Sequence, residues 1–107
     1  MVVGMSVATL NELTDLIQPE KIREKLPNAS FPFPKKVRLL ESDSSNGDPA
    51  YYVIVVYPNN LSDEQLKWEN VSPMVDWIRT QIHDKGDPDR FPYFRFRSEK
   101  EDKPGGW

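Results

Sequence analysis

The chain has 107 residues, no cysteine and a formal net charge of −3. This length predicts a single domain with one modest core. The absence of cysteine excludes a disulfide framework, a thiolate nucleophile and a cysteine-ligated zinc site, and the slightly acidic balance gives no sign of a general affinity for nucleic acid. No stretch reaches the ~20 apolar residues of a membrane span, and the first residues do not resemble a signal peptide, so we expect a cytoplasmic protein without membrane association.

Two short helices are expected first. Apolar residues recur at helical spacing over residues 6–17, and Thr9 with Glu12 has the spacing of a capping box. Pro19 interrupts this pattern and suits the first turn of a second helix that ends at Leu26. The spacing is equally compatible with one helix bent at Pro19.

A proline-rich segment, residues 27–34, follows these helices. Three prolines in eight residues predict an extended, irregular loop. We expect its two aromatic residues, Phe31 and Phe33, to anchor it to the edge of the core.

Residues 36–43 and 50–57 are expected to form a hairpin. Asn46-Gly47 lies between them, a pair that favours positive φ at both residues of a tight turn. The second strand, Ala-Tyr-Tyr-Val-Ile-Val-Val-Tyr, is apolar on both faces. Such a strand is typically central in its sheet, with neighbours on both sides.

Two helix starts follow the hairpin. Ser62 and Gln65 have capping-box spacing, which predicts a short turn over residues 62–68. Pro73 suits the first position of a helix, so the main helix is predicted over residues 73–84. Gly86 is expected to end it in the left-handed conformation.

Residues 91–98 are expected to form the third strand. Phe94 and Phe96 fall on one face, and the alternate positions carry Tyr93, Arg95 and Arg97. From residue 99 the chain is charged, so we expect residues 1–98 to form the domain and residues 99–107 a flexible tail.

The predicted order is helix, helix, strand, strand, helix, strand. This order predicts an α+β fold, a two-layer sandwich in which helices cover one face of a small mixed three-stranded sheet. The first two strands are antiparallel, and a strand–helix–strand connection joins the last two.

The second face of this sheet is the candidate functional feature. If Phe94 and Phe96 face the helices, the alternate residues of the third strand face away from them. The first helix or the Phe31–Phe33 loop could cover this face, a second copy or another protein could bind it, or single-stranded nucleic acid could stack on it. The candidate interaction surface comprises Tyr93, Arg95, Arg97, Arg38, Tyr51 and Tyr57.

No catalytic pattern is present. His83, the only histidine, lies beside Asp84 with no nucleophile of matching spacing, and Asp87-Pro88-Asp89 is typical of a turn rather than of a metal site. Glycines form no phosphate-binding fingerprint. We therefore expect no catalytic residue, no cofactor and no metal.

The leading hypothesis is a non-enzymatic protein-interaction module that acts through a sheet face or edge, as a homodimer or as a subunit of a larger partner. The alternative is a nucleic-acid-associated accessory protein that uses a set of basic residues, namely Arg95, Arg97, Arg38, Lys35 and Lys36. A third hypothesis is a small-molecule binder or an enzyme with its site in a cleft beside Asp87, Asp89 and Arg90.

Overall fold

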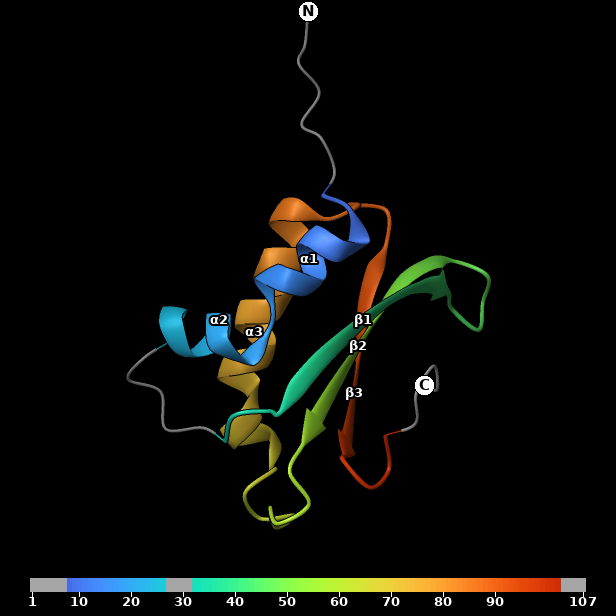
Figure 1. Cartoon of the computed structure of the whole chain (residues 1–107). Coiled ribbons are helices and arrows are strands. Elements are labelled where there is room, and N and C mark those ends of the chain that lie inside the picture. Colours follow the sequence, from blue (N-terminus) through green and yellow to red (C-terminus); the bar gives the residue numbers. More distant parts are fainter. Residues whose placement is uncertain (1–7, 27–31, 103–107) are drawn as a thin grey trace, which may run out of the picture.

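The structure is a computed structural model that describes residues 8–26 and 32–102. Its elements are α1 (Leu10–Leu16), α2 (Pro19–Lys25), β1 (Lys36–Asp43), β2 (Pro49–Tyr57), α3 (Trp68–Lys85) and β3 (Phe91–Ser98). The helices lie on one side of a three-stranded mixed sheet (Figure 1). The predicted α+β fold and element order are therefore confirmed.

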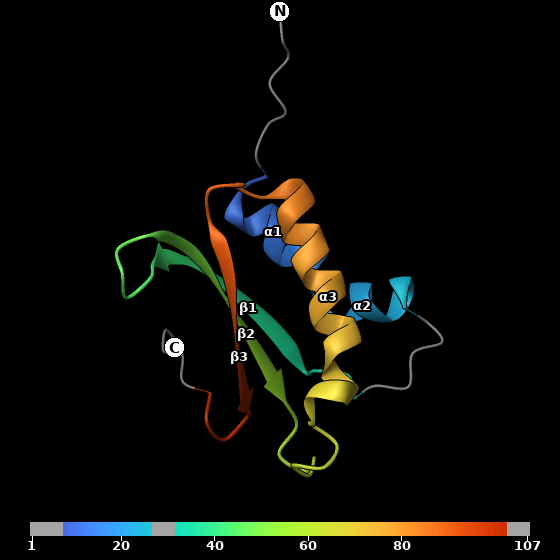
Figure 2. The same ribbon diagram turned by 180° about the vertical axis from the view of Figure 1, so that it is seen from behind.

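The sheet has the order β1-β2-β3, with β2 in the centre. β1 pairs with β2 in antiparallel register, and β3 pairs with β2 in parallel register, so that Val53 lies beside Leu39 on one side and beside Phe94 on the other. The parallel pairing requires a crossover, which α3 supplies as it runs alongside the sheet and returns the chain to β3 (Figure 2).

The N-terminal segment forms two helices rather than one bent helix. α1 begins after Thr9, whose Oγ1 accepts a hydrogen bond from the Glu12 N–H (3.1 Å), while Glu12 Oε1 accepts one from the Thr9 N–H (2.9 Å). This confirms the predicted capping box. α2 begins at Pro19, where the missing N–H leaves no helical bond unmade.

The main helix is longer than predicted. α3 starts at Trp68 and contains Pro73, which we expected at its first position. Pro73 is the sixth residue of the helix and has no N–H, so only the helical hydrogen bond to the Glu69 carbonyl is lost. This bond lies close to the N-terminal end of the helix, where backbone groups without an intrahelical partner are normal. The predicted Ser62–Gln65 pair forms in the preceding turn, where the Ser62 N–H donates to Gln65 Oε1 (2.9 Å).

The hairpin turn uses one glycine in a positive-φ conformation. Gly47 has φ of +83°, and no other described residue has positive φ, so the expectation for Asn46 is wrong. The Gly47 N–H donates to the Ser44 carbonyl (2.8 Å), and the Ser44 N–H donates to the Asp48 carbonyl (2.7 Å). This is a three-residue loop with a glycine bulge, which needs left-handed backbone at one residue only.

Gly86 ends α3, but not in the predicted left-handed conformation. Its φ and ψ are −92° and −173°, which is extended backbone. A side chain is excluded there by close approach, since a Cβ would lie 2.8 Å from the Ile82 carbonyl oxygen and 3.1 Å from the Tyr51 hydroxyl. Glycine is thus needed because helix, turn and sheet meet at this point.

The core fills the space between the helices and the sheet. The buried residues of β2 that face it are Tyr51, Val53, Val55 and Tyr57, and those of α3 are Val71, Met74, Val75, Ile78 and Ile82. Leu13 comes from α1, Ile17 is the C-cap residue of α1, and Ile22 comes from α2. Phe94 of β3 packs against this cluster. Phe96 shares its face, beside Val55, so the predicted orientation of β3 is confirmed.

Candidate interaction surface

The second face of the sheet is formed by the residues that alternate with the core positions. On β2 these are Tyr52, Ile54 and Val56, which are all buried. Beside them lie Lys36, Arg38 and Leu40 on β1 and Tyr93, Arg95 and Arg97 on β3, and Phe91 continues the same face of β3 beside Ala50. We call the four β3 residues the aromatic–arginine strip.

Two residues predicted for the interaction surface lie elsewhere. Tyr51 and Tyr57 are 2% and 1% exposed and face the helices. The Tyr51 hydroxyl accepts a hydrogen bond from the Asp87 N–H (2.8 Å), and the Tyr57 hydroxyl lies 4.0 Å from Met74 Sδ. Burial raises the pKa of Tyr57. Both tyrosines are therefore core residues that stabilise the fold, and the candidate surface must be drawn without them.

Two residues of the aromatic–arginine strip, Tyr93 and Arg95, pack on Tyr52. The Tyr93 ring stacks on the Tyr52 ring with centroids 5.5 Å apart, and the Arg95 guanidinium carbon lies 5.3 Å from the Tyr52 centroid. Phe91 lies 5.0 Å from Tyr93 in a tilted contact. Phe91 and Tyr93 nevertheless remain 60% and 40% exposed. Tyr93 and Arg95 were predicted for this face, whereas Tyr52 and Phe91 were missed.

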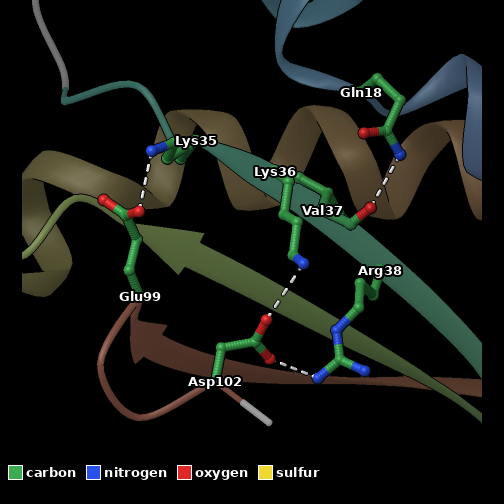
Figure 3. Close-up of polar contacts among 7 residues, drawn as sticks. All are labelled: Gln18, Lys35, Lys36, Val37, Arg38, Glu99 and Asp102. Atoms are coloured by element: carbon green, nitrogen blue, oxygen red, sulfur yellow. Dashed lines mark hydrogen bonds and ion pairs between the residues drawn. The ribbon is translucent and has the colours of Figure 1, made fainter. Parts of the chain in front are cut away.

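The basic residues of β1 are engaged by a carboxylate from the end of the chain. Lys36 Nζ lies 3.2 Å from Asp102 Oδ2, and Arg38 forms an ion pair with Oδ1 of the same carboxylate (Figure 3). The Asp102 side chain is only 8% exposed. Burial raises the pKa of Asp102, but the hydrogen bond from Lys36 and the charge of Arg38 outweigh it, so the pKa lies below its usual value.

Residues 99–102 are bound to the sheet. The Glu99 N–H donates to the Tyr57 carbonyl (2.9 Å), the Lys100 N–H donates to Asn59 Oδ1 (2.9 Å), and Glu99 forms an ion pair with Lys35 (2.8 Å; Figure 3). The predicted flexible tail was drawn from residue 99 onward. Glu99 and Lys100 make these contacts, Asp102 makes the ion pairs described above, and residues 103–107 lie outside the described residues.

The two edges of the sheet differ. At the β1 edge, Gln18 Nε2 donates to the Val37 carbonyl oxygen (2.7 Å; Figure 3), and α1 packs against β1. The same amide donates to the Thr14 carbonyl (2.9 Å), which fixes it at the end of α1. An acceptor that could pair with an incoming strand is therefore already occupied at this edge.

The β3 edge is built differently. The bond from the Glu99 N–H to the Tyr57 carbonyl shows which alternate residues of this strand hydrogen-bond to β2. By this alternation, the backbone N–H and C=O groups of Tyr93, Arg95 and Arg97 point toward β2. The backbones of the alternate residues, Pro92, Phe94 and Phe96, point away from the sheet. All eight residues of β3 are exposed or half-buried. No strand lies beyond β3 in the described part of the chain.

A hollow of about 340 Å³ adjoins the start of β3, where it meets the end of α3. Its lining residues are Arg79, Ile82, His83, Asp87, Pro88, Asp89, Arg90, Phe91 and Pro92. This is the cleft expected beside Asp87, Asp89 and Arg90. The surface of the lining is mainly apolar.

The polar residues at this hollow have structural partners. The Asp89 N–H donates to Asp87 Oδ1 (2.9 Å), the predicted turn bond. Arg90 donates to the carbonyls of Ser42 (3.3 Å) and Ala50 (3.1 Å), which ties the loop to the hairpin. Within residues 8–26 and 32–102, no three acidic or histidine side chains gather as a metal-binding group. The His83 side chain is 84% exposed and lies beside Asp84.

Comparison of the chain with family models, with curated proteins and with solved structures gave no match. None of the described helices combines the length and apolar composition that a membrane crossing requires.

Proposed function

We propose that this chain is a small non-enzymatic protein-interaction module that binds another polypeptide along β3. The observation that carries the proposal is the state of this edge. β3 is a terminal strand of eight residues, none of them buried, and the backbones of Phe94 and Phe96 point away from the sheet. An exposed edge of this kind is a template for an added strand, which gains affinity from main-chain hydrogen bonds.

The side chains of β3 also favour a protein partner. Aromatic residues and arginine are enriched at protein interfaces, whereas lysine and the acidic residues are depleted. Residues 91–97 consist of three Phe, one Tyr, two Arg and one Pro. Phe91, Tyr93 and Phe96 are the large apolar side chains of this strand that remain well exposed. An added strand would remove part of this apolar surface from water.

Single-stranded nucleic acid is the second candidate. The exposed Tyr93 ring beside Arg95 resembles a position where a base could stack. However, three of the five basic residues assigned to that role, Lys35, Lys36 and Arg38, form ion pairs with acidic residues. The positive charge on this face is thereby reduced, and for this reason we rank a polypeptide first.

A photo-crosslinking amino acid at position 93, incorporated in the native cells, tests both candidates. The matched control carries the same group at the exposed Glu69 of α3. We expect a discrete protein adduct at position 93 and none at position 69. A nuclease-sensitive adduct would support the nucleic-acid alternative instead. If irradiation yields no adduct at position 93, the proposed function is wrong.

A further inference from the structure

The segment 91–97, Phe-Pro-Tyr-Phe-Arg-Phe-Arg, is chemically complementary to itself when it is reversed about Phe94. We propose that the polypeptide bound along β3 is a second copy of this chain, paired antiparallel about Phe94 to form a six-stranded sheet. This inference rests on the proposed function and names its partner. A two-fold axis through Phe94 makes the contact isologous, so that both copies use the same residues.

The backbone supports four hydrogen bonds in this register. Phe94 lies opposite Phe94 of the second copy, and the two residues exchange both of their N–H···O bonds. Phe96 lies opposite Pro92 of the second copy and donates its N–H to that carbonyl, and the symmetry repeats this bond. Pro92 has no N–H to donate, but its carbonyl is sufficient for this role.

Every arginine of the strip meets an aromatic ring in this register. Arg95 lies opposite Tyr93 of the second copy, and Arg97 lies opposite Phe91 of the second copy. Directly opposed residues have Cβ atoms about 4.5–5.5 Å apart, which allows a guanidinium to reach the facing ring. Within one chain, Arg95 already makes such a contact with Tyr52 on this same face.

The neighbouring registers are less favourable. Pairing about Arg95 also allows four backbone bonds, but it places Arg95 directly opposite Arg95 of the second copy, and opposed like charges are destabilising. Pairing about Phe96 opposes Arg95 and Arg97 twice. Pairing about Tyr93 leaves Phe96 beyond the paired strands. The number of hydrogen bonds does not distinguish pairing about Phe94 from pairing about Arg95, and the repulsion between the arginines therefore favours pairing about Phe94.

The helix side of the sheet agrees with this register. Phe96 stacks on Tyr57 (6.4 Å between centroids) yet remains 40% exposed. In the pairing about Phe94 it faces Pro92 of the second copy, which lines the hollow at the end of α3. An exposed ring thus meets an apolar hollow, and the axis creates this contact twice.

Cysteine pairing tests the register directly, because the natural chain has no cysteine. Tyr93→Cys and Arg95→Cys replace exposed side chains, and Glu69→Cys serves as the control. Single-cysteine proteins, one carrying a mass tag, are mixed in pairs, oxidised mildly and separated by mass. Circular dichroism of each variant verifies that it is folded.

We expect the mixed disulfide, which joins position 93 of one copy to position 95 of the other, to predominate. The reason is that only directly opposed Cα atoms lie within disulfide reach. A predominant disulfide between two copies of the Tyr93→Cys variant, or between two copies of the Arg95→Cys variant, would overturn the register. Equal disulfide formation by the control would overturn it as well.

The mass of the natural chain in solution tests self-pairing itself. We expect sedimentation to give twice the 12.4 kDa chain mass at high concentration. A 12.4 kDa species at every concentration overturns self-pairing. In that case, a photo-adduct of position 93 with a different protein would still support the proposed function.

Discussion

Replacement of Phe96 by proline, compared with replacement by alanine, isolates one backbone group at the β3 edge. Both variants lose the ring that stacks on Tyr57. Only Phe96→Pro also loses the N–H, which points away from β2. Proline is compatible with an edge strand when its nitrogen faces outward, and it favours extended backbone at Arg95, which already lies in the strand.

The difference between the two variants has a definite expected size. In the proposed dimer each copy donates one Phe96 N–H, so proline removes two of the four intermolecular backbone bonds. A hydrogen bond contributes a net free energy of about 0.5–1.5 kcal/mol, which gives a dimer weaker by roughly 1–3 kcal/mol. This corresponds to a dissociation constant about 5- to 150-fold higher for the proline variant than for the alanine variant.

Sedimentation equilibrium over a range of protein concentrations measures the two dissociation constants. Urea unfolding at concentrations where both variants are monomeric measures the stability of the fold, which we expect to be nearly equal in the two. Equal dissociation constants would refute the role of the Phe96 N–H in pairing. A proline variant that is unfolded while the alanine variant is folded would refute the outward orientation of this group.

Two further predictions concern contacts of the sheet. The lowered pKa of Asp102 means that its ionised form contributes stability above the usual pKa of 3.8, and that this contribution is lost as the pH falls through the lowered value. The free energy of unfolding of Asp102→Asn, measured with urea, should therefore be below that of the natural chain at pH 6 and converge with it as the pH falls through the lowered pKa of Asp102. A difference that stays constant as the solution is acidified would contradict the ion pairs with Lys36 and Arg38. Gly86→Ala should lower the free energy of unfolding by about 1–3 kcal/mol, because its Cβ would press on the Ile82 carbonyl and the Tyr51 hydroxyl. An unchanged unfolding midpoint would show that helix and sheet do not approach so closely there.

The sequence predicted the orientation of β3 but not that of β2, for a physical reason. β3 alternates between aromatic and charged residues, so only one face suits the core, and the predicted positions of Phe94 and Phe96 were right. β2 is apolar at every position from Ala50 to Tyr57 and is buried on both faces. Such a strand carries no signal for which set of side chains faces the helices, and Tyr51 and Tyr57 were therefore assigned to the wrong face.

Other residues were misjudged because their partners are distant in the sequence. Pro73 has the local preference of a first helical position, yet the preceding turn joins α3 because Val71 is buried in the core. Asp102 lies in a charged segment with no local pattern, and its partner Arg38 is 64 residues away. Gln18 reaches β1 in the same way. Phe91, in contrast, follows the alternation of its strand and could have been assigned to the strip.

The amide of Gln18 has a consequence for the size of any assembly. A sheet with two open edges can add copies without limit, and such growth produces fibrils. Here the Val37 carbonyl at the β1 edge already accepts a hydrogen bond from Gln18, so a further strand would first have to displace that side chain. Pairing through β3 uses the β3 edge of both copies and leaves a β1 edge at each end of the six-stranded sheet, so a single glutamine at each of these edges would keep the assembly at two copies.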